Sequence, residues 1–580
     1  MESKTPQFDK LLDEILDTLV PHSRECKWKG KHPYCEGEFE ITNEDIEFLK
    51  ILRVPAPICC PTCRKIQRRA FVNTAVLYKH INNAPGNSNS IVSFVPPASP
   101  LIVYDVASYL NIFEPYNYGV IYDESRSFVD QFYDLRLSVP QPAVIRDPSN
   151  INSEYSINGR NSKNCYWVSG AWSSEDIWYS NLLHQSKEIM DSVRIDKSER
   201  CYECVSSKSL YNSQYLYYSE NCINSYLLFD CRNCQDCFGC VNLRNKRYCW
   251  FNKQLSKEEY EIELSSANFQ SRKLCQTWLD KFWSFVRTQP IRAARIEQSE
   301  NVTGVDILNC KNCHDVIHCE RSEHGRHLDS VMGNKDSMDA HGSGSSEKLY
   351  GTSAVGSQCS NVKFSFASKF ITDSEFLINC RNCSNCFACI GLQNKSYSIF
   401  NKQYEPNQYF EELDRIKSSM MSKGEYGEFL PYNFSTFAYN GSSADIPFPL
   451  TEEQVKELGA LWQPEIEIDI VVNMTILKSD DVPDTISEVT DEILNQAIIC
   501  EETGRLFRII TTELEFYRKH HIPLPTIHPY LRIRSKLKKL GNVMVNRTIC
   551  SSCKKEIDSM YGPEGNFILY CEDCYKLEVY

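Results

Sequence analysis

The sequence predicts a mainly β protein built on a duplicated parallel β-solenoid, with helical caps and a zinc-ribbon module at each end. Three observations predict this architecture: an apolar pattern that repeats about every 12 residues, a direct internal duplication, and Cys-x2-Cys knuckles near both ends. The chain has 580 residues, of which 42% are apolar and 24% charged. This length suits several domains, and the composition excludes wholesale disorder.

From the N-terminus, residues spaced for one face of a helix predict an amphipathic helix that docks on this protein or on a partner. This stripe comprises Phe8, Leu11, Leu12, Ile15, Leu16 and Leu19. The segments that we expect are an N-terminal helix and zinc-knuckle module (1–80), a connecting region (81–150), a first solenoid (151–253), a helical insert (254–297), a second solenoid (298–402), a helix (403–425), an acidic extension or linker (426–495) and a C-terminal zinc-ribbon module (496–580).

The middle of the chain alternates short aromatic or apolar stretches with turns rich in Asn and Ser, which is typical of stacked β-strands. Rows of this repeat begin at Cys165, Ile177, Ile189, Cys201, Ser213, Ser225, Cys237 and, one residue early, Tyr248. Further rows lie near Val305, Val316, His327, Asp339, Tyr350, Val362, Ser374, Cys386 and Tyr397. The spacing leaves open whether twelve residues make a whole turn of the solenoid or half of one.

The two repeat regions are copies of each other. Residues 231–240 match 380–389, and both copies continue into Phe-Asn-Lys-Gln, at 251–254 and 400–403. The offset is 149 residues throughout, which indicates an internal duplication. A helical pattern follows each copy, and we expect these helices to cover the end of each solenoid.

The cysteines at 231–240 and 380–389 allow two interpretations. Their Cys-x2-Cys spacing is similar to that of iron–sulfur ligands. However, Cys201 and Cys237 share one row position, and Cys204 and Cys240 share another. Free cysteine buries readily as a small apolar residue, so we favour structural ladders of thiols and keep metal binding as the alternative.

The C-terminal cysteines have the spacing of a structural zinc ribbon. Cys550 and Cys553 form one knuckle, and Cys571 and Cys574 form a second one seventeen residues later. Four thiolates complete a tetrahedral Zn²⁺ site and leave no open position, so the expected role of this cofactor is structural rather than catalytic.

A looser version of this pattern lies at the N-terminus. Cys60 and Cys63 form a knuckle, and Cys26 with Cys35 can supply the other two thiolates, with Cys59 as a neighbour. The alternative is an unpaired knuckle in a folded loop.

The two ends are related to each other, since 39–57 parallels 507–525. On that alignment, Thr503 and His528 stand where the N-terminal copy has Cys35 and Cys60. The region around 84–108 has no cysteine, although it aligns with the C-terminal ribbon. Each end therefore keeps one half of a two-site module. Cys500 and His528 are remnants for which we predict no metal.

Charge separates along the chain. The net charge of −13 argues against a protein that coats nucleic acid with its whole surface, and 451–495 carries twelve acidic residues against two lysines. Basic residues beside the zinc knuckles predict a phosphate-binding surface, with a solvated helix face as the alternative. These residues are Arg64, Lys65, Arg68, Arg69, Arg532, Arg534, Lys536, Lys538 and Lys539.

Five of the twelve histidines lie between residues 314 and 341. They are interpreted as turn and surface residues, because no two of them have a diagnostic motif spacing. The alternative is a metal or acid–base site on the second solenoid. This group comprises His314, His318, His324, His327 and His341.

The chain shows no signal peptide and no apolar run of membrane-spanning length, so we expect reduced thiols, a cytoplasmic location and no membrane contact.

Several motifs together resemble one family. They are Cys-Pro-x-Cys-Arg-x3-Arg-Arg at 60–69, Phe-x-Asp-Gln-Phe-x-x-Leu at 128–135, both Cys-Phe-x-Cys copies with their Phe-Asn-Lys-Gln runs, and Tyr-Cys-Glu-Asp-Cys-Tyr at 570–575. They resemble an uncharacterised zinc-ribbon family of candidate-phyla bacteria and of large DNA viruses of protists. The resemblance implies this architecture, and the host cytoplasm if the source is viral, but it brings no established activity.

The sequence thus favours a non-enzymatic zinc-binding scaffold that contacts RNA or a ribonucleoprotein assembly through its basic zinc modules, with protein partners besides. Two alternatives remain. One is a metal-assisted hydrolytic enzyme with its site on the second solenoid. The other is a platform for protein assembly alone.

Overall fold

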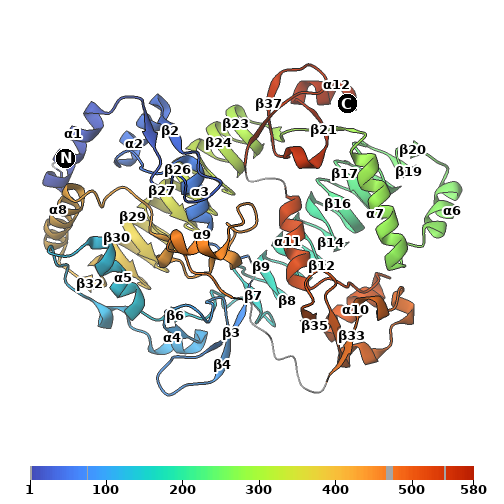
Figure 1. Cartoon of the computed structure of the whole chain (residues 1–580), viewed down its shortest axis with the longest axis horizontal. Coiled ribbons are helices and arrows are strands. Elements are labelled where there is room, and N and C mark those ends of the chain that lie inside the picture. The colour runs from blue at the N-terminus through green and yellow to red at the C-terminus, as the bar shows by residue number, and fades with distance from the viewer. Residues whose placement is uncertain (1–2, 75, 465–473, 541–543) are drawn as a thin grey trace.

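Two stacks of parallel strands form the centre of the molecule, and smaller modules and helices surround them (Figure 1). The computed structural model describes residues 3–74, 76–464, 474–540 and 544–580. The first stack comprises the sheet β7–β20 and the second comprises the sheet β22–β32. The prediction of a strand-rich protein with parallel strand ladders is confirmed.

In the first stack, each residue lies beside the residue twelve positions later. Ile177 pairs in parallel with Ile189 and Asn181 pairs with Val193, so twelve residues make one whole turn. The strands are β7 (Ser156–Ile157), β8 (Lys163–Tyr166), β9 (Val168–Trp172), β10 (Glu175–Trp178), β11 (Asn181–His184), β12 (Lys187–Met190), β13 (Val193–Asp196), β14 (Glu199–Tyr202), β15 (Val205–Lys208), β16 (Tyr211–Tyr217), β17 (Tyr226–Phe229), β18 (Gln235–Phe238), β19 (Arg247–Trp250) and β20 (Lys253–Gln254).

The second stack keeps this geometry with small irregularities. Most steps join residues twelve apart, as in Ile371 beside Cys383, but Ser346 lies beside Cys359, thirteen residues on. Its strands are β22 (Ile296–Glu297), β23 (Glu300–Leu308), β24 (Lys311–Glu320), β25 (Glu323–Arg326), β26 (Asn334–His341), β27 (Ser346–Ser353), β28 (Cys359–Lys363), β29 (Lys369–Ile378), β30 (Arg381–Ile390), β31 (Ser396–Ile399) and β32 (Lys402–Gln403).

The chain turns a corner at about every third residue of both stacks. Asn161, Asn164, Asp191 and Asn233 are among the many residues there with positive φ. This left-handed conformation costs most side chains about 1–2 kcal/mol, whereas Asn and Asp tolerate it. Four corners per twelve-residue turn therefore explain the Asn-rich and Asp-rich turns of the repeat.

The residue after each corner points into the stack, where small side chains link successive turns. The Ser198 hydroxyl donates to the Asp196 carbonyl at 2.8 Å and accepts from the Leu210 N–H, one turn later, at 3.0 Å. Cysteine fits the same inward position: the Cys240 thiol donates to the Phe238 carbonyl at 3.3 Å. Cys237 lies beside Cys249, so the last row begins at Cys249 and not at the predicted Tyr248.

Both stacks end in a short antiparallel hairpin formed by the Phe-Asn-Lys-Gln run, β19–β20 and β31–β32. Helices α6 (Lys257–Ala267) and α8 (Pro406–Ser422) contact these last turns, as the capping prediction requires. Helix α7 (Arg272–Val286) differs, because it covers the outer aromatic row of the first stack. Its Trp278 ring lies 5.4 Å from Phe238.

The modules at the two chain ends pack on different stacks. The N-terminal module (22–112) packs on the second stack, through α2 and α3 against β26 and β27 (Figure 1). The C-terminal module (496–579) packs on the first stack through α11 against β13, and its β37 also contacts β23 of the second stack. The N-terminal elements are β1 (His22–Glu25), β2 (Glu38–Ile41), α2 (Asn43–Leu52), α3 (Pro61–Arg69), β3 (Tyr78–Ile81), β4 (Ser90–Ser93), β5 (Val103–Tyr104) and α4 (Val106–Ile112). The C-terminal elements are β34 (Gln496–Ile499), β35 (Leu506–Phe507), α10 (Thr511–Lys519), α11 (Pro529–Lys539), β36 (Asn546–Ile549), β37 (Glu556–Ser559), β38 (Ile568–Tyr570) and α12 (Glu572–Val579).

The segments between these parts are packed rather than extended. Phe434 and Phe448 are fully buried beside the second stack, and Ile486 is 4% exposed. Residues 426–464 and 474–495 thus differ from the predicted acidic linker, and 465–473 lie outside the described residues. The remaining elements are α1 (Pro6–Thr18), α5 (Phe128–Ser138), β6 (Gln141–Pro142), β21 (Pro290–Arg292), α9 (Glu452–Glu457) and β33 (Thr475–Leu477).

The predicted N-terminal helix forms as α1 and docks on this protein. Phe8, Leu12 and Leu16 are buried, and Asp414 of α8 accepts the Phe8 N–H at 2.7 Å. Among the described residues, no helix combines the length and the apolar character needed to span a bilayer.

Candidate metal centres

The structure brings together all four cysteines of the predicted N-terminal site. Cys26 follows β1, Cys35 precedes β2, Cys60 is the N-cap of α3, and Cys63 lies in the first turn of that helix. Their sulfur atoms all lie within 4.8 Å of one another, and those of Cys26 and Cys63 are 3.8 Å apart. The four residues therefore form a group that could hold a metal ion.

Backbone donors and two further side chains surround this N-terminal cluster. The N–H of Cys60 donates to the Cys26 sulfur at 3.2 Å, and that of Gly37 donates to the Cys35 sulfur at 3.4 Å. Nε2 of buried His32 lies 3.2 Å from the Cys63 sulfur, a contact that sequence spacing did not predict. A hydrogen bond from the Cys59 thiol lowers the pKa of Cys26 to about 4. A hydrogen bond from Cys63 likewise lowers the pKa of Cys60, whereas burial raises the pKa of Cys35 to about 11. Negative charge is therefore favoured on Cys26 and Cys60.

The C-terminal site also assembles as predicted. Cys550 and Cys553 follow β36, and Cys571 caps α12 with Cys574 in its first turn. All four sulfurs lie within 4.8 Å of one another, and those of Cys553 and Cys571 are 3.7 Å apart.

The C-terminal cluster is more open than the N-terminal one. Cys553 is exposed and Cys571 and Cys574 are half-buried, whereas three of the four N-terminal cysteines are buried. Burial opposes ionisation of Cys550, but backbone N–H groups, including that of Cys571 at 3.3 Å, lower its pKa to about 6. This sulfur is therefore prepared to bind a cation near neutral pH.

Each module contains a second site in which other residues replace the thiols. In the N-terminal module, Asn82 follows β3 as Cys550 follows β36, and it accepts the Asp105 N–H at 3.2 Å. Its amide also donates to the Asp105 carboxylate at 2.6 Å. In the C-terminal module, Cys500 follows β34 as Cys26 follows β1, and its sulfur accepts the His528 N–H at 3.4 Å. Among the described residues, no metal-binding group forms at either position.

The predicted nucleic-acid-binding residues lie mostly at the interface between modules and stacks. Arg64, Arg68, Arg69, Arg532 and Lys536 are at most 6% exposed. Of the others, Lys65, Arg534 and Lys539 are half-buried and Lys538 is exposed.

Carboxylates of the two stacks pair with the buried cations. Arg64 and Arg68 lie 2.6 and 3.0 Å from Asp339, Arg69 lies 2.5 Å from Asp329, Arg532 lies 2.6 Å from Asp191, and Lys536 lies 2.6 Å from Glu203. These guanidinium groups hold the pKa of Asp329 and of Asp339 below the usual value, against the opposing effect of burial. The buried cations thus dock the modules and do not form the predicted phosphate-binding surface.

The histidine group lies partly in the same interface. His318, His324 and His327 occupy corners of the stack, as the turn interpretation predicts. His327 and His341 are buried, however, and lie 3.6 and 3.4 Å from the carboxylates of Asp45 and Asp329. His324 stacks on Phe48 of α2 at 4.3 Å. These contacts are structural, because each histidine packs against the docked module or a neighbouring turn.

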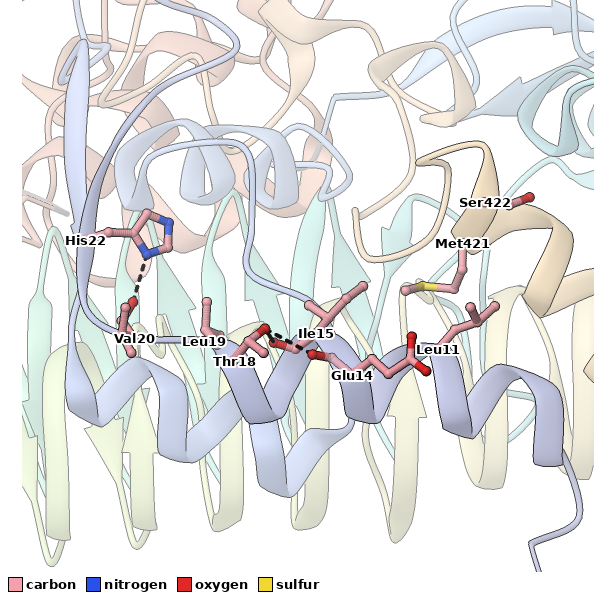
Figure 2. Close-up of a pocket in the computed structure, with 9 residues that line it drawn as sticks. All are labelled: Leu11, Glu14, Ile15, Thr18, Leu19, Val20, His22, Met421 and Ser422. Atoms are coloured by element: carbon pink, nitrogen blue, oxygen red, sulfur yellow. Dashed lines mark hydrogen bonds between the residues drawn. The ribbon is translucent and has the colours of Figure 1, made fainter.

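An open groove lies elsewhere, between α1 and the end of α8 (Figure 2). Its volume is about 540 Å³. In Figure 2 the side chains of Leu11 and Met421 face each other across it, and His22 Nδ1 lies 2.9 Å from the Val20 carbonyl oxygen. The five histidines at 314–341 do not line this groove.

Comparisons with known proteins add no family to these observations. A scan against models of known protein families finds no match, and no curated protein sequence matches the chain. The resemblance suggested by the motifs therefore stays a prediction.

Proposed function

We propose that the protein is a non-enzymatic scaffold in which two β-solenoids are locked together by two structural zinc-ribbon modules. The observation that carries this proposal is the assembly of both four-cysteine clusters in modules that dock on the stacks. In this proposal the stacks are two long rigid bodies, and the docked modules determine which part of the surface of each stack stays accessible to a partner.

The sulfur geometry supports Zn²⁺ as the ion. In a tetrahedron with Zn–S distances of about 2.3 Å, each sulfur–sulfur edge is about 3.8 Å long. One sulfur pair in each cluster, at 3.8 Å and 3.7 Å, matches that edge. Four thiolates fill the coordination sphere, which is the arrangement of a structural site and leaves no position for substrate.

We propose protein partners rather than RNA. Five of the nine cations that predicted an RNA-binding surface are buried in ion pairs within the protein, and the half-buried Arg534 pairs with Asp445 at 2.6 Å. Their charge is therefore not available to bind phosphate. The aromatic rows are engaged as well: Trp178 packs on Phe516 and Tyr202 packs on Tyr517 in the C-terminal module.

The hydrolytic alternative is less favoured, because His324 and His327 contact the docked module and His341 pairs with Asp329 of a neighbouring turn.

We also propose a reducing compartment such as the cytoplasm. All 28 cysteines are free thiols in the structure, and both clusters need thiolates.

The zinc proposal is tested by metal analysis of the purified full-length protein. We expect two zinc ions per chain, one lost in Cys60→Ser and one lost in Cys550→Ser. Two variants are matched controls. Cys59→Ser removes a buried thiol next to the N-terminal cluster, and Cys500→Ser removes a buried thiol at a position of the C-terminal module where no four-cysteine cluster forms. Zinc content unchanged in Cys60→Ser and Cys550→Ser would contradict the proposal.

The choice of partner is tested by affinity purification after ultraviolet crosslinking, with and without nuclease. Protein partners that survive nuclease treatment, with no crosslinked RNA, are the expected result. RNA crosslinked to the modules would restore the nucleic-acid hypothesis.

A further inference from the structure

A third group of thiols gathers inside the second stack. Cys310, Cys313 and Cys319 are buried, and their sulfurs all lie within 4.8 Å of one another. The sulfurs of Cys310 and Cys319 are 3.5 Å apart. Together with Val316, these residues are the inward side chains of a single turn, so three sides of that turn point sulfur at the axis.

This turn differs from the two turns in which all four inward residues are cysteine, 231–240 and 380–389. Thiols of all three turns donate to the carbonyl group two residues earlier, as Cys389 does to Phe387 at 3.2 Å and Cys310 does to Leu308 at 3.3 Å. The difference lies in the sulfur positions. Among the described residues, neither of the four-cysteine turns brings three sulfurs within 4.8 Å of one another, whereas the turn at 310–319 does.

We propose that Cys310, Cys313 and Cys319 form a three-coordinate site for one soft metal ion, Cu(I). The described group contains sulfur alone, with no His, Asp or Glu ligand atom. Zn²⁺ in structural sites takes four ligands, and Val316 occupies the fourth side of this turn. Thiolates select soft ions, among which Cu(I) is satisfied by three sulfurs.

The site lies near the beginning of the stack, which gives an ion a short route inward. Only one row of the stack precedes the three cysteines. The apolar side chains of that end that pack against this core, Ile296 and Val302, are only partly buried.

The test is an anaerobic titration of the zinc-loaded, full-length protein with Cu(I), in competition with the chelator bathocuproine disulfonate. We expect Cys319→Ser to bind one equivalent of Cu(I) less than the wild type. The matched control is Cys386→Ser, which removes an inward thiol of the same stack from a turn in which no three sulfurs all lie within 4.8 Å of one another. Both variants are expected to fold, since serine already occupies inward positions such as Ser337 and Ser374.

Equal binding by the wild type and Cys319→Ser, or an equal loss in both variants, would overturn the proposal. Zinc content is measured in the same samples, so a loss of zinc from the four-cysteine clusters is distinguished from a loss of Cu(I) binding. X-ray absorption of the copper-loaded protein is expected to show three sulfur neighbours, and a different number would also contradict the proposed site.

Discussion

The two end modules dock in the same way but keep different four-cysteine clusters. Arg64 on α3 pairs with Asp339 of the second stack, and Arg532 on α11 pairs with Asp191 of the first. The two arginines are 468 positions apart, which is also the offset between the related module sequences 39–57 and 507–525. The two aspartates are 148 positions apart, one fewer than the offset of 149 between the cysteine rows, because the second stack has a thirteen-residue step between Ser346 and Cys359. Equivalent cations therefore meet equivalent carboxylates at both ends.

The four-cysteine clusters, by contrast, lie in opposite halves of the two modules. Cys60 caps α3 within a thiol cluster, whereas His528 caps α11 and accepts the Tyr530 N–H at Nδ1, at 3.1 Å. The ion pairs therefore hold the modules on the stacks, and hydrogen bonds can replace a thiol cluster without loss of the docked arrangement.

The largest effect is expected from removing a ligand of the buried N-terminal cluster. Cys60→Ser should release its zinc and unfold the N-terminal module, since structural zinc contributes on the order of 10 kcal/mol of apparent folding free energy. Cys574→Ser should cost less, because the C-terminal cluster is more open to solvent. Thermal unfolding followed by zinc release measures both, with Cys59→Ser as the control. A larger loss in Cys574→Ser would contradict the comparison.

The second effect concerns docking at the two ends. Asp339→Asn should destabilise by about 3–5 kcal/mol, because it leaves the buried guanidinium groups of Arg64 and Arg68 without this carboxylate. Asp191→Asn should cost less, because Arg532 keeps the carboxylate of Glu513 at 3.2 Å. The control is Asp336→Asn, whose partner His324 is partly exposed. Urea unfolding gives the free energies, and a larger cost in Asp191→Asn would contradict this difference between the ends.

A third effect distinguishes the ends by pH. Burial lowers the pKa of His528 from its usual 6.5 to about 3. Below pH 6.5 the unfolded chain binds a proton that the folded chain does not, so stability present above pH 6.5 is lost as the pH falls towards 3. At pH 5 the loss is about 2 kcal/mol.

The N-terminal module has Cys60 at the position of His528. Its own buried histidine, His32, lies beside the thiol cluster instead, and burial lowers the pKa of that histidine too. His528→Asn keeps a good N-cap and should remove the contribution of His528. Hydrogen exchange of α11 at pH 7 and pH 5 is the measurement. A pH dependence that persists in the variant would assign it to another group.

The smallest effect compares the two stacks. Ser198→Ala and Ser337→Ala each remove the acceptor for a backbone N–H of the next turn, that of Leu210 or Leu349. Each should cost about 1 kcal/mol in urea unfolding. Ser125→Ala, on an exposed loop, is the control and should be neutral. A cost in only one stack would show that the interiors are not equivalent.

Local patterns predicted much of the fold and both four-cysteine groups. The spacing of Cys550 to Cys574 placed four thiols correctly, because knuckles bring their own cysteines together and one strand–helix unit joins them. The predicted row start at Tyr248 was wrong by one residue, because the twelve-residue spacing from Cys237 continues unchanged to Cys249. The sequence predicted that the basic residues of α3 and α11 lie on the surface, because the residues around Arg64 carry no information about an aspartate 275 positions away that pairs with it.

The repeat, the duplication and the thiol knuckles follow from the amino-acid sequence alone, since each is a property of neighbouring residues and their spacing. Three features depend on the folded arrangement: which stack each module contacts, which cations are buried, and that three sulfurs lie within 4.8 Å of one another at Cys310, Cys313 and Cys319 but not in the longer cysteine rows. Burial and sulfur–sulfur distances depend on how turns and modules stack in space. A one-dimensional pattern does not contain that information.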